Sequence, residues 1–134
     1  MNRISIRLPL AAIGAAALLA ISTGAFAANS GKEAATAAQH AGFAAKSANI
    51  KQVHMHLHHA INCLVGPKGD GFDAKEANPC AAEGNGAIPD ATDAKMKDMY
   101  MKAVKTAKMG LATDDLAKAQ KQATMVKMEL KKAM

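Results

Sequence analysis

The sequence predicts an all-α protein, an up-down four-helix bundle with a long central loop pinned by a disulfide. Three observations lead to this fold class. Four stretches repeat apolar residues at spacings of three and four, which is the period of an amphipathic helix. No strand is predicted beside these four helical patterns. All the prolines beyond the N-terminal region fall within residues 66–92, where no period is sustained, so this segment is the expected loop.

The N-terminus has the pattern of a secretory signal peptide. Arg3 and Arg7 precede an apolar run over residues 8–21, and small residues follow up to Ala27. We expect cleavage after Ala27, so that residues 1–27 are a signal peptide and residues 28–134 form one domain. The apolar run is shorter than a membrane span requires, and no second run follows. The mature protein is therefore expected in the periplasm or outside the cell, without stable membrane insertion.

Two helices are predicted before the loop. Residues 32–47 are dense in alanine, a strong helix former whose small side chain lets a neighbouring helix approach closely. Asn49 offers an N-cap or a break before a second helix. Gly66 and Pro67 end that helix. Its apolar face consists of Ile50, Val53, Leu57, Ile61 and Leu64.

Two further helices are predicted after the loop. Asp93 can cap a third helix that runs to about Gly110, and Thr113 or Asp114 can cap a fourth. The fourth shows apolar residues at strict three and four spacing, typical of the seam of a bundle helix: Leu116, Ala119, Ala123, Val126, Leu130 and Ala133.

The two cysteines are expected to form a disulfide. Cys63 and Cys80 flank much of the glycine-rich loop, and an oxidising compartment favours pairing. The sequence has neither the C-x-x-C spacing of a catalytic pair nor the C-x-x-C-H motif of covalent haem attachment. The bond would tie the loop to the end of the second helix.

Composition argues against two broad classes of function. The chain has a net charge of +6, but both arginines lie in the signal region and only three aromatic residues lie outside it, which weakens a nucleic-acid reading. No nucleophile, base and orienting group are arranged for catalysis, and the E-x-x-H motifs of di-metal oxidases are missing. We therefore predict a protein that is not an enzyme and binds no nucleic acid.

The segment "HMHLHH", residues 54–59, carries four of the five histidines and predicts a metal site. His54 and His58 lie one helical turn apart, so their imidazoles could share one ion, and they are the preferred ligands. The further candidates, in decreasing order, are His56, His59, Met55 and His40. Imidazoles suit Cu(II), Ni(II) and Zn(II), and thioethers suit Cu(I). Copper is the first choice of metal, with nickel and zinc as alternatives.

Two other readings compete with a site for a metal ion held by side chains alone. A histidine beside an apolar face is commonly a partly buried side chain with a hydrogen-bond partner, so the cluster could belong to a structural or protein-interaction bundle. A b-type haem protein is the third reading. The sequence itself indicates no particular protein partner.

The combination of export, alanine-rich helices and "HMHLHH" resembles the small periplasmic metal-binding proteins, which are histidine-bearing helical bundles. This resemblance implies binding of copper and other divalent ions, for handling or buffering. Members of that class spread histidine along most helices and lack a cysteine pair, which favours one or two sites here. In length and topology the chain also looks like the cytochrome b562 class, but its C-terminal helix has no histidine to serve as the axial ligand.

Overall fold

The computed structural model describes residues 28–134, and this part of the chain is helical with no strand. The all-α prediction is therefore confirmed. The predicted signal peptide lies outside the described residues. Within 28–134, every helix is too short or too polar to cross a membrane.

The first two helices are separate, and each has an asparagine cap. Helix α1 spans Ser30–Lys46, and the side chain of Asn29 accepts a hydrogen bond from the Lys32 amide at 2.9 Å. Helix α2 spans Ile50–Val65, and Asn49 accepts from the Gln52 amide at 3.0 Å. Each cap satisfies an amide that has no partner inside its helix. The sequence-based choice of Asn49 as a cap is confirmed.

The last two long helices are α4, Ala94–Leu111, and α5, Leu116–Ala133. Asp93 caps α4, as predicted, by accepting from the Met96 amide at 2.7 Å. The predicted cap of α5 was wrong, because Asp115 takes that place and accepts from the Lys118 amide at 3.0 Å. Thr113 instead accepts from the Asp115 amide. Three successive residues suited to capping precede this helix, and propensity alone does not choose between them.

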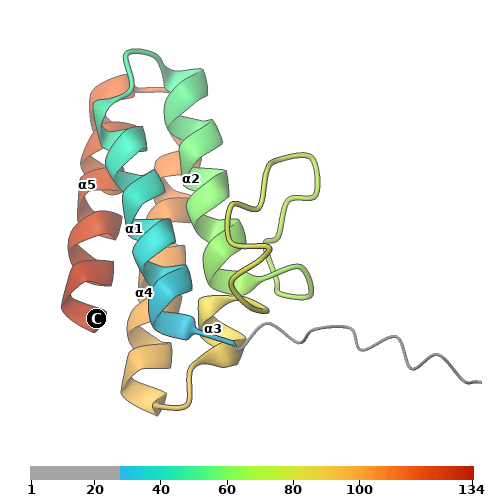
Figure 1. Ribbon diagram of the computed structural model, residues 1–134. Helices are drawn as coiled ribbons and strands as arrows, with labels where there is room; N and C mark the ends of the chain where they lie inside the picture. The colour runs from blue at the N-terminus through green and yellow to red at the C-terminus, as the bar shows by residue number, and fades with distance from the viewer. Residues whose placement is uncertain (1–27) are drawn as a thin grey trace, which may run out of the picture.

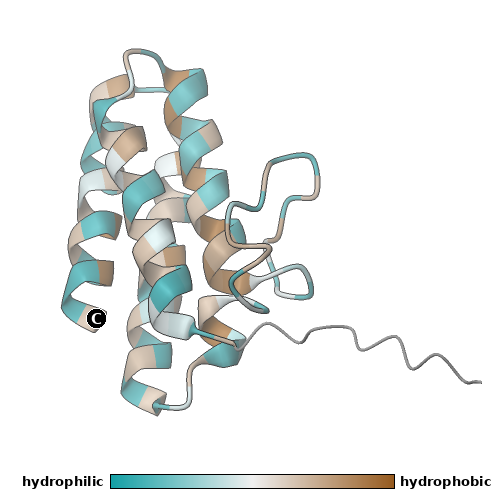
Figure 2. Cartoon of the chain, in the orientation of Figure 1, coloured by the Kyte–Doolittle hydropathy of each residue, from teal (hydrophilic) through white to brown (hydrophobic). Residues whose placement is uncertain are grey.

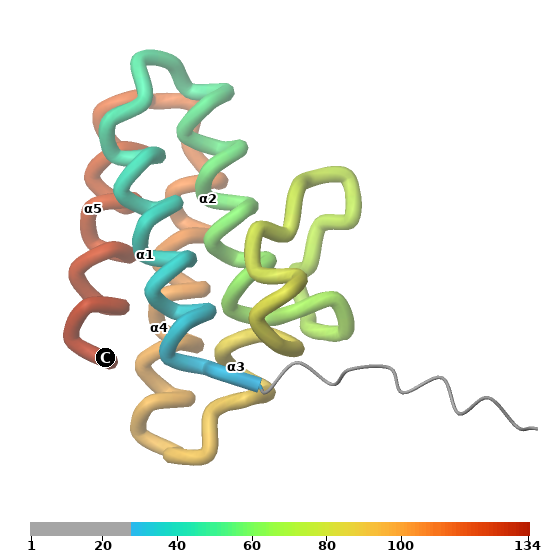
Figure 3. Tube along the Cα trace, in the orientation of Figure 1, coloured from blue at the N-terminus to red at the C-terminus, as the bar shows by residue number. Residues whose placement is uncertain are grey.

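The four long helices pack side by side around a narrow core. Helix α1 packs against α2 and α5, and α4 packs against α5 and α2, as Figures 1 and 3 show. Each long helix carries both hydrophobic and hydrophilic residues (Figure 2), as an amphipathic helix does. The core-facing side of α1 is lined by small residues that are buried: Ala34, Ala37, Ala38, Ala41 and Ala44. Larger buried side chains fill the centre: Leu57, Ile61, Leu64, Tyr100 and Leu130.

The connection between α2 and α4 is long, and a disulfide joins it to α2. Cys63 and Cys80 are bonded, with their Cα atoms 5.2 Å apart, so this predicted bond is present. The loop contains a short helix, α3, Ala87–Asp90, that the sequence did not predict. Gly66 and Gly86 have positive φ angles of 68° and 118°. A Cβ atom at Gly66 would collide with the backbone of Asn85, and one at Gly86 would collide with the backbone of Gly66. Because glycine has no side chain, the backbone at the beginning of the loop can lie in direct contact with the backbone near its end.

Candidate metal centre

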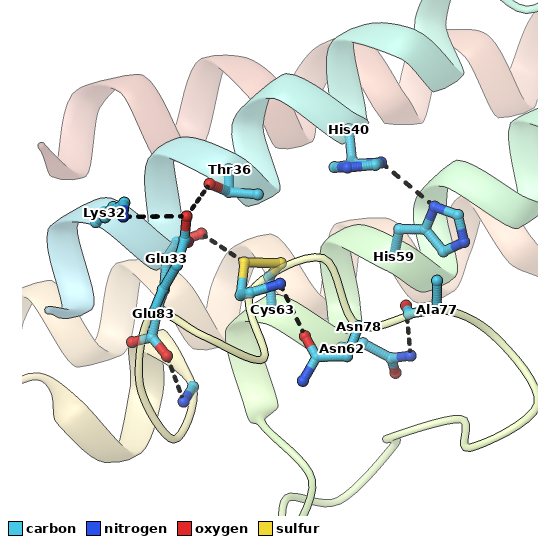
Figure 4. Close-up of a disulfide and its surroundings, with 12 residues drawn as sticks. Lys32, Glu33, Thr36, His40, His59, Asn62, Cys63, Ala77, Asn78 and Glu83 are labelled. Carbon is cyan, nitrogen blue, oxygen red and sulfur yellow. Dashed lines mark hydrogen bonds and ion pairs between the residues drawn. A yellow bond between two sulfur atoms is a disulfide. The ribbon is translucent and has the colours of Figure 1, made fainter. Parts of the chain in front are cut away.

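Three histidines from two helices meet at the α1–α2 interface. His40 lies on α1, and His56 and His59 lie on α2. The Nδ1 atom of His40 is 3.3 Å from Nδ1 of His56 and 3.3 Å from Nδ1 of His59. One ring nitrogen of each histidine lies within 4.8 Å of the other two. Figure 4 shows the rings of His40 and His59 turned toward each other. We call these residues the histidine triad.

Helix geometry explains how the triad assembles. His56 and His59 are three residues apart, so they lie on one face of α2. Helix α1 packs along that face and presents His40 between them. Phe43, one turn further along α1, has its ring centroid 5.5 Å from that of His40 and 5.4 Å from that of His56. Phe43 is 43% exposed, and its contacts with two imidazoles explain why an apolar residue occupies this surface position.

The environment keeps the triad uncharged near neutral pH. Burial, and secondarily the nearby His59 and His56, lower the pKa of His40 from 6.5 to about 4. Burial also lowers the pKa of His56, with His59 adding to the effect. The pKa of His59 is lowered by burial too, and Glu76 partly opposes this. Neutral imidazoles have free lone pairs, which is the form that ligates metals.

The disulfide-bonded loop brings carboxylates to the outer side of α2. Oε2 of Glu76 lies 3.6 Å from Nε2 of His59, and Oδ2 of Asp73 lies 3.6 Å from Nδ1 of His58. A carboxylate beside one ring nitrogen favours a proton there and leaves the other nitrogen free as a ligand. Glu76 therefore favours the tautomer of His59 in which Nδ1, the atom facing His40, can bind an ion.

Asn62 holds this part of the loop in place. Its side chain is fully buried, accepts from the Asp73 amide at 2.8 Å, and donates to the carbonyls of Asp73 at 2.9 Å and Ala77 at 3.1 Å. Figure 4 shows the dashed line from Asn62 to Ala77 of the loop. A buried amide with these partners fixes the backbone on both sides of Glu76. The sequence reasoning missed Asn62, although a polar residue between Ile61 and Cys63 on an inward helical face was a usable signal.

The structure groups the six predicted ligands differently from the predicted order. It brings together His40, His56 and His59, but His54 and His58 are not members of this group. Nε2 of His54 lies 3.0 Å from the Thr113 carbonyl oxygen, where it can donate a hydrogen bond to the α4–α5 turn. His58 faces Asp73, and Met55 is half-buried elsewhere on α2. Spacing on one helix favoured His54 with His58, whereas the position of α1 selects the other pair.

A second buried polar feature lies at the start of α1. Glu33 is fully buried, and its Oε1 accepts a hydrogen bond of 2.6 Å from the Gly86 amide. Burial raises the pKa of Glu33 from 4.5 to about 7, the Gly86 hydrogen bond opposes the rise, and the Asp90 carboxylate adds to it. The sequence reasoning missed this residue. Its helical register with Ala37 and Ala41 was the signal, since these positions share the inward face of α1.

These two groups predict opposite pH dependences of stability. The lowered pKa of His40 contributes stability that is present above about pH 6.5 and is lost as the pH falls toward 4. The raised pKa of Glu33 contributes stability that is present below about pH 4.5 and is lost as the pH rises through 7. Replacing Glu33 by glutamine should therefore make the free energy of unfolding rise more steeply with pH between about 4.5 and 7.

Urea unfolding at several pH values measures this slope. Asp98→Asn removes an exposed carboxylate and serves as the control for a lost negative charge. A Glu33→Gln variant with the same slope as the parent protein would show that Glu33 stays ionised throughout this range.

Comparison of the chain with models of protein families, with curated proteins and with solved structures finds no match. Function must therefore be argued from the site itself.

Proposed function

We propose that this protein is an exported transition-metal-binding protein that handles or buffers copper or zinc rather than catalysing a reaction. One observation carries the proposal: three half-buried imidazoles from two helices direct ring nitrogens at a common point. The signal-peptide pattern and the disulfide support export. Each triad residue keeps a part of its surface exposed, which would let an ion enter and leave, as a cargo requires.

The spacing of the nitrogens bears on the choice of ion. Metal–nitrogen bonds of about 2.0–2.1 Å place neighbouring ligands about 3.3 Å apart in a tetrahedron and about 2.9 Å apart in a square plane. Both Nδ1 distances from His40 are 3.3 Å. Tetrahedral coordination favours Zn(II), or copper as Cu(I), over the tetragonal ions Cu(II) and Ni(II). Three protein ligands leave a fourth position through which an ion could pass to another carrier.

The charges around the triad would help it retain a cation. Glu76 lies against His59, and a negative group behind a ligating imidazole strengthens its donation to a metal. Lys32, which is paired with Glu83, lies two turns from His40 on α1. The full chain has a net positive charge, whereas the Glu76 carboxylate places a negative charge beside the triad.

Thermal unfolding with and without metal tests this function. An ion that binds only the folded state should stabilise the mature protein by about 2.7 kcal/mol when its concentration is a hundred times the dissociation constant. We expect the midpoint to rise with Zn(II), and with copper under reducing conditions mild enough to spare the disulfide. The rise should shrink at pH 4, where protons compete for His40. If none of Zn(II), Cu(I), Cu(II) and Ni(II) moves the midpoint at pH 7.5, the structural or interaction bundle becomes the better account.

A further inference from the structure

A pocket of about 730 Å³ lies on a different side of the molecule, between the loop and the outer face of α4. The end of α2, the loop after it, and α3 form the walls opposite α4. Its apolar lining is contributed by Val65, Pro67, Ile88, Pro89, Met101 and Val104. The volume is within the range of about 300–1,000 Å³ that is usual for small-molecule sites. None of the triad histidines lines it, so it is separate from the proposed metal site.

Lysine side chains surround this apolar surface. Lys68, Lys97 and Lys108 line the pocket together with two acidic residues, Asp70 and Asp90. Each acidic residue already has a partner in the structure. Asp70 is 3.3 Å from the Lys108 ammonium, and Asp90 accepts hydrogen bonds from the backbone and side-chain nitrogens of Asn85 at 2.7 and 3.0 Å.

Lys97 is the most informative of these lysines. It is half-buried, whereas Lys68 and Lys108 are exposed. Among the described residues, no carboxylate oxygen lies within 4.0 Å of its ammonium nitrogen. A lysine whose hydrocarbon stem lies along an apolar surface can pair its ammonium with an anion that carries its own apolar group. Met101, which is 47% exposed, offers a flexible side chain that can adapt to such a group.

We propose that this pocket binds a small organic anion, a carboxylate or sulfonate attached to an aromatic or medium-length hydrocarbon body. The apolar body lies against Val65, Ile88 and Met101, and the acid group is directed to Lys97 at the rim. Lys68 adds a second positive charge nearby. The two proposed sites share no residue, so variants at one site can be tested apart from the other.

Fluorescence titration with 8-anilinonaphthalene-1-sulfonate tests the proposal, since this dye combines an aromatic body with a sulfonate. The folded protein should bind one dye in a saturable manner, and decanoate should displace it better than decanol does. Met101→Glu places a negative charge in the pocket, and Lys97→Glu removes the positive charge at its rim. Each change should weaken dye binding at least tenfold. Both side chains reach the surface, so the fold should tolerate either change.

Matched controls separate this site from general surface binding. Met128→Glu and Lys121→Glu make the same changes at exposed positions of α5 that do not line the pocket, and should bind the dye as the parent does. His40→Ala should also leave dye binding unchanged, whatever its effect on metal. Equal dye affinity in the Met101→Glu, Lys97→Glu and parent proteins would overturn the proposal, as would equal displacement by decanol and decanoate.

Discussion

Replacement of His40 by alanine is expected to weaken Zn(II) binding at least about 100-fold, since loss of a ligand should exceed the 10–100-fold cost typical of outer-shell changes. His40 is the residue that joins the two helices at the site, because its Nδ1 lies 3.3 Å from Nδ1 of both His56 and His59. Without it, α2 alone supplies two imidazoles at a spacing of three residues. Isothermal titration with a competing chelator measures the affinity. Glu76→Gln should cause a smaller loss, about 10–100-fold, because it removes only the partner of His59.

His54→Ala and His58→Ala are the matched controls for this result. Both remove an imidazole from α2, and both residues lie outside the triad. Each should leave the affinity for Zn(II) within a few-fold of the parent value. Affinity that depends on His54 and His58 but not on His40 would instead support the pair preferred from the sequence and contradict the three-histidine site.

Replacing both Cys63 and Cys80 by alanine is expected to lower the free energy of unfolding by about 3 kcal/mol, the loop-closure contribution for a bond of this span. Urea unfolding measures the loss. Because the bond ties the loop to α2, trypsin should also cleave faster after the exposed residues Lys68 and Lys75. The helices should persist, because most of the buried core residues are apolar side chains of the four long helices other than the two cysteines.

The same double variant also tests how the loop supports the metal site. Glu76 reaches His59 from the loop, so a freer loop should weaken Zn(II) binding toward the level of Glu76→Gln. Asn62 remains as a second attachment and should limit the effect. If the variant keeps full stability and resists trypsin as the parent does, the noncovalent contacts of the loop, such as the Asn62 hydrogen bonds, fix it without the disulfide.

Sequence periodicity was sufficient to predict the helical class and the positions of the long helices. Their apolar faces repeat at the helical period, and Asn49 and Asp93 belong to the residue types most strongly preferred as N-caps. Periodicity was less informative where several residues could play one role, as at the start of α5. It also gave no sign of α3, whose four residues are too short to show a period.

The candidate site was harder to predict, because it depends on which helix faces which. The histidine cluster drew attention to α2, but four histidines in six residues surround much of the helix. The choice among them follows from the packing of α1, which covers the side of His56 and His59, while His54 faces the α4–α5 turn. Contacts between helices depend on how the whole core packs, so the spacing of residues within one helix does not predict them.

The loop carries the features that sequence reasoning could least anticipate. Glu76 of the loop reaches His59 of α2, and Asn62 of α2 reaches Asp73 and Ala77 of the loop, because the chain doubles back after α2. Gly66 and Gly86 touch where this loop begins and ends. No local pattern specifies that path. The disulfide could be inferred from compartment and cysteine count, whereas the hydrogen bonds that it accompanies required the structure.

X-ray absorption at the zinc edge tests the three-histidine site most directly. Mature protein loaded with one equivalent of Zn(II) should show three imidazole nitrogens at about 2.0 Å, with the outer-shell scattering typical of histidine rings. The His40→Ala variant should lose one of them. A spectrum without imidazole scattering, or one with the same number of histidines in the parent and His40→Ala proteins, would contradict the account.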